Sequence, residues 1–368
     1  MSFPVLPSAE DQGFPQPVDH GGCLPPPPAF ACEVGGPYRQ SRGDARARLS
    51  QDRPAPRPPL TGPCPSSINA SMSPAPDILC IGSCLWDIIG RTPSHMRLGA
   101  DVPGRITRVP GGVAMNIAMT LRRFGLRPAL LTAIGRDPEG DQLVDEAARL
   151  GLVTDFAYRS EDLPTDRYMA VEGGNGLVAA IADAHSLEAA GDKILRPLAD
   201  GRLGSLEAPW PGPVALDGNL TLDLLARIAS SPLFLRADLR VAPASPGKAE
   251  RLLPLLAHPG ATIYVNLEEA GLLCQREFAC SEEAAHGLLA RGARRVLVTH
   301  GGLSASCGDC FGVLTQAPPE VLVTRVTGAG DTFMAAHVVA EREGAGKASA
   351  LSRALRAAAL YVSGDNPT

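Results

Sequence analysis

Near residue 76 the chain changes from a segment without hydrophobic periodicity to an alternating pattern. Residues 1–75 are rich in proline, with runs such as LPPPPAF and RPAPRPPL, and show no sustained apolar period. Such a segment cannot bury enough apolar surface to offset the entropy of ordering it. We therefore predict a disordered extension over residues 1–75. This extension is either dispensable or absent from the natural protein, if translation starts at Met72. The alternative is a proline-rich ligand for an aromatic-lined groove of another protein.

Beyond residue 76, short apolar runs that indicate buried strands alternate with runs of helical period. The predicted strands are residues 77–83, 105–109, 128–135, 212–219, 233–239, 261–266 and 294–302, with a hairpin over 167–183. The predicted helices are residues 111–125, 139–151, 220–230, 248–258 and 282–292. This alternation predicts an α/β fold with a mostly parallel sheet covered by helices on both faces. Ligands of such sheets bind at the carboxyl ends of the strands.

Composition narrows the class of protein. The 368 residues are 45% hydrophobic, which is enough for a substantial core, and the net charge of −5 gives no reason to expect nucleic-acid or membrane binding. No apolar run approaches the ~18–20 residues of a membrane helix, and the N-terminus lacks a secretory pattern. The 9 cysteines lie mostly in apolar runs, which suits reduced thiols in a cytoplasmic protein. The CxxC pair Cys307 and Cys310 is interpreted as part of a turn or hairpin.

The stretch LVTRVTGAGDTFMAAH offers the clearest candidate chemistry. Thr327, Gly328, Ala329 and Gly330 place successive backbone N–H groups at the start of a predicted helix, where they form an anion hole. Asp331 follows, and its carboxylate is placed to take a proton from a substrate hydroxyl while those N–H groups hold phosphate charge. No Lys-Ser/Thr pair follows, so this is not a Walker A loop, and the dinucleotide-binding fingerprint is absent.

Two further stretches follow predicted strands and belong to the same rim of the sheet. Asp87 can accept hydrogen bonds from two neighbouring sugar hydroxyls, or cap the next turn. Gly111 and Gly112 begin a helix and allow close approach of the backbone to a ligand, with Asn116 one turn further on. Two glycines before a helix are also common in ordinary loops.

The stretch VNLEEA places Asn266 and Glu269 on one face of a predicted helix. Their oxygen atoms suit Mg²⁺, bound directly or through water. The same spacing also fits a capping box, in which the two residues satisfy backbone N–H groups at a helix start. The sequence leaves both interpretations open.

Taken together, these stretches resemble the ribokinase-like (PfkB) carbohydrate kinases. The stretches PGGVAMNIAMTLRRFG and VTGAGDTFMAA resemble the two signatures of that family, YVNLEEA matches its Asn-x-x-Glu motif, and LVTHGG resembles its nucleotide-side Thr-x-Gly stretch. All four occur in the family order over about residues 76–368. Within the family, GADVPGRITRVPGGVAMNIA, Val326 before Thr327, and the pair Asn366–Pro367 are most similar to pseudouridine kinases.

The resemblance implies a three-layer ribokinase-like fold with a small β-sheet lid, and a kinase domain over residues 76–368. It also implies transfer of the γ-phosphate of ATP, with Mg²⁺, to a hydroxymethyl group such as the 5′-hydroxyl of a nucleoside. Asp331 would be the general base beside the anion hole. By the family pattern, the acceptor would contact Asp87, Gly111, Gly112 and Asn116, and the nucleotide and Mg²⁺ would contact Asn266, Glu269, Thr299, Gly301, Gly302 and Thr327.

The implied lid comprises strands at about residues 98–109 and 165–183, with Asp183 either contacting the base or ribose or acting as a turn residue. The lid is also the candidate surface for a homodimer. Two residues depart from the family pattern. Arg325 stands where many members have Asp, near a monovalent-cation site, which argues against dependence on K⁺. Ser304 stands where many have Gly.

Three functions remain in competition. A small-molecule kinase acting on pseudouridine is favoured, with ribose, fructose or adenosine as other acceptors. A catalytically silent, sugar- or nucleotide-sensing relative on the same fold is the second, because fold does not fix function. A silent relative has no need of Asp331 beside an intact Gly-Ala-Gly, so that residue favours catalysis. A dehydrogenase is the third, and it lacks the dinucleotide fingerprint.

Overall fold

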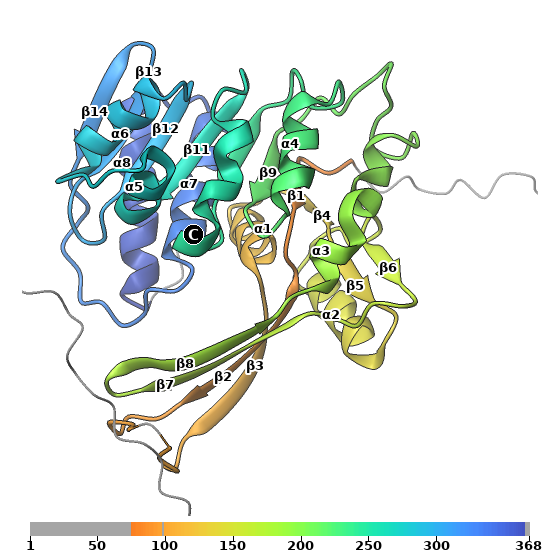
Figure 1. The fold of residues 1–368 in the computed structure, drawn as a ribbon, viewed down its shortest axis with the longest axis vertical. Helices are drawn as coiled ribbons and strands as arrows, with labels where there is room; N and C mark the ends of the chain where they lie inside the picture. The colour runs from red at the N-terminus through yellow and green to blue at the C-terminus, as the bar shows by residue number, and fades with distance from the viewer. Residues whose placement is uncertain (1–74, 98, 365–368) are drawn as a thin grey trace, which may run out of the picture. The chain divides into compact units, whose positions relative to one another are not determined.

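The structure is a computed structural model that describes residues 75–97 and 99–364 (Figure 1). The predicted disorder of residues 1–75 therefore lies, apart from Ala75, outside the described residues. The strands of the main sheet are β1 (Ile78–Ile81), β4 (Pro128–Leu131), β9 (Val214–Asp217), β10 (Leu239–Ala242), β11 (Ala261–Asn266), β12 (Arg295–Thr299), β13 (Ala305–Asp309) and β14 (Gly312–Gln316). They lie in the order β14-β13-β12-β11-β10-β9-β1-β4. The sheet is parallel except for the pairs β12–β13 and β13–β14.

Both faces of this sheet are buried, and the alternation along β1 shows how. Ile78 and Cys80 pack into one hydrophobic core, whereas Leu79 and Ile81 pack into the core on the opposite face. All four side chains are fully buried. A strand that is apolar at every position is what a parallel sheet between two helix layers requires.

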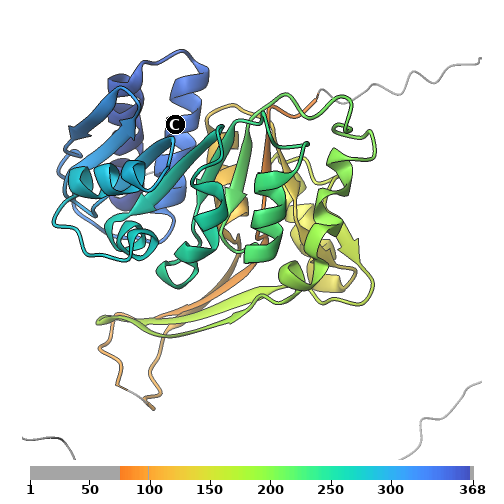
Figure 2. The ribbon, with the colours of Figure 1, turned by 45° about the horizontal axis from the view of Figure 1, so that its top comes forward.

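The two helix layers lie on opposite faces of the sheet (Figures 1 and 2). One layer comprises α1 (Val113–Arg123), α2 (Pro138–Arg149), α7 (Ala329–Arg342) and α8 (Lys347–Val362). The other comprises α3 (Ser186–Ala190), α4 (Leu222–Ser230), α5 (Leu267–Cys274), α6 (Ser281–Ala290) and the 3₁₀ helices η1 (Gly191–Leu198) and η2 (Pro246–Leu255). None of the helices in the described residues is both long enough and apolar enough to cross a membrane.

A second sheet extends from the body beside the main sheet (Figure 1). Its strands are β2 (Leu85–Arg91), β3 (Arg105–Gly111), β7 (Arg167–Gly173) and β8 (Gly176–Asp183), in the order β3-β2-β7-β8. We call this sheet the lid. Two short strands, β5 (Ala133–Gly135) and β6 (Tyr158–Ser160), pair with each other separately.

Several elements differ from the sequence predictions. β3 begins at Arg105, as the hydrophobic pattern predicted, so the lid strand implied from about residue 98 starts later than the resemblance suggested. β2, which carries Asp87, was not predicted. The strand predicted over 233–239 is wrong, because residues 232–236 form turns and β10 starts at Leu239. The helix predicted over 248–258 is a 3₁₀ helix that contains Pro254, which has no N–H to donate to an α-helical ladder.

The cysteines described by the structure are free thiols. Cys80 and Cys84 are buried, as their apolar neighbours predicted. Cys307 lies buried in β13, and Cys310 is exposed in the turn between β13 and β14. The CxxC spacing is therefore part of a hairpin, as interpreted from the sequence.

Candidate active site

The predicted site residues converge on a cavity of about 570 Å³ at the carboxyl ends of the parallel strands. One wall is the lid, and the others come from the starts of α1 and α7 and from the loops that follow β9, β10 and β11. Among the predicted site residues, the cavity is lined by Asp87, Gly112, Asn116, Asn266, Glu269, Thr299, Thr327, Gly328, Gly330 and Asp331. Residues that are up to 244 positions apart, such as Asp87 and Asp331, thus contribute to one site.

The turn that begins α7 is held in an unusual backbone conformation. Gly328 caps the helix with φ of 88°, which favours glycine. A Cβ on Gly328 would lie 2.6 Å from the hydroxyl oxygen of Tyr361, and that hydroxyl donates a hydrogen bond to the carbonyl oxygen of Thr327 at 2.9 Å. Space for a Cβ is open at Gly330. The glycine at 328 is therefore required by the packing of Tyr361 as well as by the turn.

The structure changes one detail of the predicted anion hole. The N–H of Ala329 donates to the carbonyl oxygen of Val326 at 3.0 Å, and Ala329 does not line the cavity. Gly328 and Gly330 do line it, at the positive end of the α7 dipole. An anion in the cavity would therefore meet the backbone at Gly328 and Gly330 instead of at three successive residues.

Asp331 lies in the first turn of α7, beside this backbone. Burial raises the pKa of its carboxyl group to about 7, and the carboxylates of Asp217, Glu269 and Asp87 add to that rise. A hydrogen bond from Nδ2 of Asn116 to Oδ2 of Asp331, 3.1 Å long, acts in the opposite direction. Asp331 is thus a carboxyl group that changes its protonation state near neutral pH.

Asp87 lies on the cavity face of the lid, and Gly111 is what makes room for it. A Cβ on Gly111 would lie 2.0 Å from Oδ2 of Asp87, although Gly111 itself does not line the cavity. Gly112 has φ of 94°, and a Cβ there would lie 2.6 Å from the carbonyl oxygen of Ser83. Burial raises the pKa of Asp87 to about 6. The two glycines therefore allow the start of α1 to meet both β2 and the segment after β1.

Three polar residues that the sequence analysis missed hold this corner together. Asp217, fully buried at the end of β9, accepts hydrogen bonds from the N–H and Oγ of Ser83 at 2.8 and 2.6 Å and from the N–H of Ala114 at 3.2 Å. Oγ of Ser83 in turn accepts from the N–H of Val113 and from Nδ2 of Asn219, both at 2.9 Å. The signal in the sequence was the polar run Asp-Gly-Asn directly after an apolar strand.

Asn266 and Glu269 form the capping box that the sequence left open. Oδ1 of Asn266 accepts from the N–H of Glu269, and Oε2 of Glu269 accepts from the N–H of Asn266, each at 2.8 Å. Both residues also line the cavity, and burial raises the pKa of Glu269 to about 7. The capping box fixes the two side chains at the start of α5 and engages one of the two carboxylate oxygens.

Three other predicted residues lie away from the cavity. Asp183 is exposed, because the register of β7 and β8 pairs it with Arg167 on the face opposite Tyr168. Gly301 lines a separate, more open cavity of about 700 Å³ beside α5, and Gly302 lines neither cavity. Thr299 is thus the part of the Thr-x-Gly stretch that reaches the main cavity.

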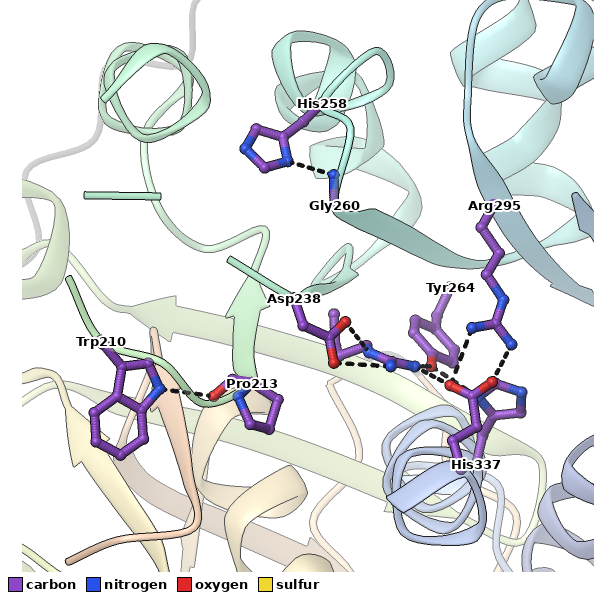
Figure 3. A network of polar contacts seen from close by, with 10 residues as sticks. Trp210, Pro213, Asp238, His258, Gly260, Tyr264, Arg295 and His337 are labelled. Atoms are coloured by element: carbon purple, nitrogen blue, oxygen red, sulfur yellow. Dashed lines mark hydrogen bonds and ion pairs between the residues drawn. The ribbon is translucent and has the colours of Figure 1, made fainter. Parts of the chain in front are cut away.

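Behind the site, a buried polar network joins α7 to the sheet (Figure 3). The hydroxyl of Tyr264 lies 2.9 Å from Nδ1 of His337, and it accepts a hydrogen bond from Arg240 at 3.2 Å. Glu341 on α7 forms ion pairs with Arg240 and with Arg295. Arg240, Tyr264 and Arg295 lie on β10, β11 and β12, so three neighbouring strands hold the helix that carries Asp331.

The sequence of this chain is similar to those of known carbohydrate kinases. The profile of the pfkB family of carbohydrate kinases matches residues 75–368. Similar proteins include the uncharacterized sugar kinase YeiI of Escherichia coli (strain K12), 30% identical over 72% of this chain and 72% of that protein. The ribokinase of Bacillus subtilis (strain 168) is 28% identical over 78% of this chain and 92% of its own length. The pseudouridine kinase of Escherichia coli (strain K12) is 27% identical, over 70% and 81%.

Solved structures agree with the fold. A carbohydrate kinase from Agrobacterium tumefaciens superposes with a TM-score of 0.64 at 25% identity, covering 77% of this chain and 89% of that one. The ribokinase of Arabidopsis thaliana complexed with ribose and ATP gives 0.61 at 19% identity, over 78% and 93%. A putative ribokinase II from E. coli, in complex with ATP and Mg²⁺, gives 0.64 at 17% identity, over 80% and 94%. These similarities confirm the predicted ribokinase-like fold.

Proposed function

Because this chain belongs to the PfkB family of carbohydrate kinases, we propose that it transfers the γ-phosphate of ATP to the 5′-hydroxyl of a nucleoside, with pseudouridine as the favoured acceptor. The observation that carries the proposal is the position of Asp331. Its carboxyl group lies at the N-terminus of α7, between the backbone of Gly330 and the side chain of Asn116. A base and an anion-binding backbone therefore face the same cavity.

The geometry supports a direct transfer. Asp331 accepts the proton of the acceptor hydroxyl as the new O–P bond forms, and the bond between the γ-phosphorus and the bridging oxygen breaks to release ADP. A pKa of about 7 suits this task, because a general base works best when its pKa lies near the operating pH. The N–H groups at the start of α7 stabilise the charge on the transferred group.

The cavity fits Mg²⁺ as an ion held mainly by the nucleotide. In the part of the chain that the structure describes, no three His, Cys, Asp or Glu side chains are grouped as a metal cage. Mg²⁺ usually keeps several waters and binds through one or two carboxylates together with substrate phosphates. Glu269, which lines the cavity with Asn266 beside it, would contact the water shell of the ion. The bound ion would neutralise charge on the phosphates.

The cavity face of the lid is longer than a free pentose needs. Leu85, Asp87 and Ile89 alternate along β2 toward the cavity, and Tyr168, Ala170 and Glu172 do so along β7. Side chains on one face of a strand repeat at about 6.8 Å, so the row of Asp87 and that of Glu172, two repeats apart, are separated by about 14 Å. Between them Ile89 and Ala170 form an apolar step. A sugar at Asp87 would thus leave room for a flat ring over that step.

Glu172 gives the far end of this surface a hydrogen-bond acceptor. Its Oε2 accepts from Nε of Arg91 at 2.6 Å, which leaves the second oxygen for a ligand. A uracil ring joined to the ribose through carbon presents two N–H groups, which suits a carboxylate. Free ribose is the second candidate, because the ribokinase of Bacillus subtilis matches this chain over more of its own length. Free ribose would contact Asp87 and Asn116 but would not reach Glu172.

Arg325 supports activity without K⁺. Its guanidinium lies 3.9 Å from the centre of the Tyr361 ring, and its Nε donates to the carbonyl oxygen of Tyr361 at 2.7 Å. A fixed positive charge thus already lies beside the turn that precedes α7. We include independence from K⁺ in the proposed function, together with a cytoplasmic location.

The outer face of the lid supports a homodimer as part of the same proposal. Ile88 and Met169 are paired across β2 and β7, and Met169 is paired with Ile181 on β8. With Ile106 they form an apolar surface on the face opposite the cavity, and Ile106 and Ile181 are 78% and 62% exposed. A second copy of the lid would cover this surface. Size-exclusion chromatography of the wild type and Met169→Glu tests this part.

An ADP-release assay against a panel of acceptors tests the proposed function. The panel contains pseudouridine, uridine, adenosine, ribose and fructose, with a reaction lacking acceptor as background and with and without K⁺. We expect the highest kcat/KM with pseudouridine, a 5′-monophosphate as product, and no change on omitting K⁺. A preference for ribose would move the assignment to the second candidate. ATP binding without ADP release from any acceptor would instead indicate a silent relative.

A further inference from the structure

The proposed phosphate-transfer cavity is rich in acid and contains a single basic side chain among the residues that the structure describes. Its acidic lining residues are Asp87, Glu172, Glu269 and Asp331, and its basic residue is Lys248. Glu172 is paired with Arg91, so the carboxylates of Asp87, Glu269 and Asp331 are the ones that repel a triphosphate brought into the cavity. The position of Lys248 therefore strongly affects where the phosphate groups of a nucleotide can bind in the cavity.

Lys248 has no acidic partner among the described residues. Its ammonium group donates one hydrogen bond, to Oδ1 of Asn219 at 2.6 Å. An ammonium group has three N–H donors, so two remain for a ligand. Asn219 is neutral, and its own Nδ2 donates to Ser83. The lysine is thus held at the cavity wall by a group that does not neutralise its charge.

The place of Lys248 in the fold puts it between the two halves of the site. It lies in η2, just after the carboxyl end of β10, and β10 lies between β9 and β11 in the sheet. Asn219 follows β9 and is joined through Ser83 to the start of α1, on the proposed acceptor side, whereas β11 ends at Asn266, on the proposed nucleotide side. A side chain between these strands can reach a phosphoryl group that passes from one side to the other.

We propose that Lys248 contacts the terminal phosphoryl group of the bound nucleotide during its transfer, releasing Asn219 as it does so. This inference rests on the proposed kinase function. The transferred group carries charge on its equatorial oxygens in the transition state, and a cation placed against them lowers the barrier. The start of α7 and Lys248 would then contact the same phosphoryl group, one with backbone N–H groups and the other with a full positive charge.

A purely structural lysine would give the same hydrogen bond to Asn219. The two roles differ in what the γ-phosphate contributes to binding. If Lys248 contacts that group, removal of its charge weakens binding of a triphosphate much more than binding of a diphosphate. If Lys248 only holds Asn219, the two nucleotides are affected alike.

Calorimetric titration of the full chain with Mg·ADP and with Mg·AMP-PNP, a non-hydrolysable ATP analogue, separates these roles. The main variant is Lys248→Gln, which keeps a donor for Asn219 but removes the charge, and Lys248→Met is a second uncharged variant. Lys248→Arg restores the charge. Lys193→Met is the matched control, because Lys193 lies outside the cavity, near the ring of Tyr158. Thermal unfolding of each variant checks that it is folded.

We expect Lys248→Gln and Lys248→Met to bind Mg·AMP-PNP about 10- to 100-fold more weakly, with Mg·ADP affinity changed less than about twofold. Lys248→Arg should recover most of the loss, and Lys193→Met should match the wild type. Equal weakening for both nucleotides, or no change for either, would overturn the assignment of Lys248 alone. A wild type that binds neither nucleotide would count against the proposed function, and the role of Lys248 would be lost with it.

Discussion

Asn116 and Asp331, which are 215 positions apart in the sequence, meet at the proposed reaction centre, where Nδ2 of Asn116 donates a hydrogen bond to Oδ2 of Asp331 at 3.1 Å. Asn116 lies in the first turns of α1 and Asp331 in the first turn of α7. Each helix begins with a glycine of positive φ, Gly112 and Gly328. The two helix starts thus bring an amide and a carboxylate together, and the amide leaves one carboxylate oxygen for a substrate.

Replacement of Asp331 by asparagine tests its role as the base. The amide cannot accept the proton of the acceptor hydroxyl, so we expect kcat to fall by about 10²–10⁴-fold, the usual contribution of general-base catalysis. Nucleotide affinity should remain close to that of the wild type. Asp155→Asn, which changes an exposed residue outside the cavity, is the control. Near-normal turnover of Asp331→Asn would remove this residue from the mechanism.

The pH dependence of the rate tests the link between Asn116 and Asp331. A base with a pKa of about 7 is active when deprotonated, so kcat should rise with pH through about 7. The hydrogen bond from Asn116 lowers that pKa, and Asn116→Ala should therefore shift the midpoint to higher pH. A rise in KM alone, with the midpoint unmoved, would show that Asn116 binds substrate without tuning the base.

The raised pKa of Asp331 also predicts an effect on stability. The pKa is 3.8 for the unperturbed group and about 7 in the fold, so the folded state binds the proton more tightly. The contribution of this group to stability is therefore present in full below pH 3.8 and is lost as the pH rises through 7. Asp331→Asn removes this dependence.

We expect Asp331→Asn to exceed the wild type in free energy of unfolding by about 1–4 kcal/mol at pH 8, with a smaller difference at pH 5. Urea denaturation at the two pH values measures both differences. An equal difference at pH 5 and pH 8 would contradict the raised pKa, whatever the effect on turnover. Ionisation of Asp331 would then not change the free energy of unfolding.

The parts of the site that the sequence predicted are those encoded by contiguous residues. The stretch from Thr327 to Asp331 carries its own helix start, glycines and acid, so the local pattern was sufficient to predict the start of α7, although it did not show that Ala329 lies off the cavity. Asn266 and Glu269 were likewise predicted as a pair, and the structure shows that the capping box and the cavity lining coexist. Local geometry at a helix start depends on neighbouring residues, which explains why the start of α7 and the capping box could be predicted, whereas the catalytic and binding roles of these residues stay predictions.

Other parts of the site depend on how strands that are distant in the sequence pair in the two sheets. Asp217 ends β9, Asn219 follows it, and Lys248 follows β10, so only the order of β9 and β10 in the sheet brings these residues together. Asp183 does not line the cavity, because side chains alternate along a strand and the register of β7 and β8 was not known in advance. A shift of one residue would have placed it on the cavity face.

A chain that begins at Met72 should retain full activity. The family profile starts at residue 75, and the first strand of the sheet starts at Ile78, so the proposed domain lies downstream. Full-length and shortened chains are compared by kcat/KM and by thermal unfolding. A lower Tm or a loss of activity in the shortened chain would refute the prediction that residues 1–71 are dispensable.

Replacement of Glu341 tests the buried polar network behind α7. Burial opposes ionisation of Glu341, but Arg295, His337 and Arg240 hold its pKa at about 2. A carboxylate with a lowered pKa stabilises the fold above its usual pKa of 4.5, and this contribution is lost as the pH falls from 4.5 toward 2. Glu341→Gln leaves Arg240 and Arg295 without their shared carboxylate, so we expect a loss of about 3–5 kcal/mol at pH 7.

Glu343→Gln is the matched control, because Glu343 lies two residues further on and pairs with Arg353 at the surface. Exposed pairs of this kind contribute only about 0–1 kcal/mol. Urea denaturation at pH 7 and at pH 3.5 measures each variant against the wild type, and the deficit of Glu341→Gln should shrink at the lower pH. A deficit that is equal for both variants, or independent of pH, would show that the buried carboxylate does not hold α7 against the sheet.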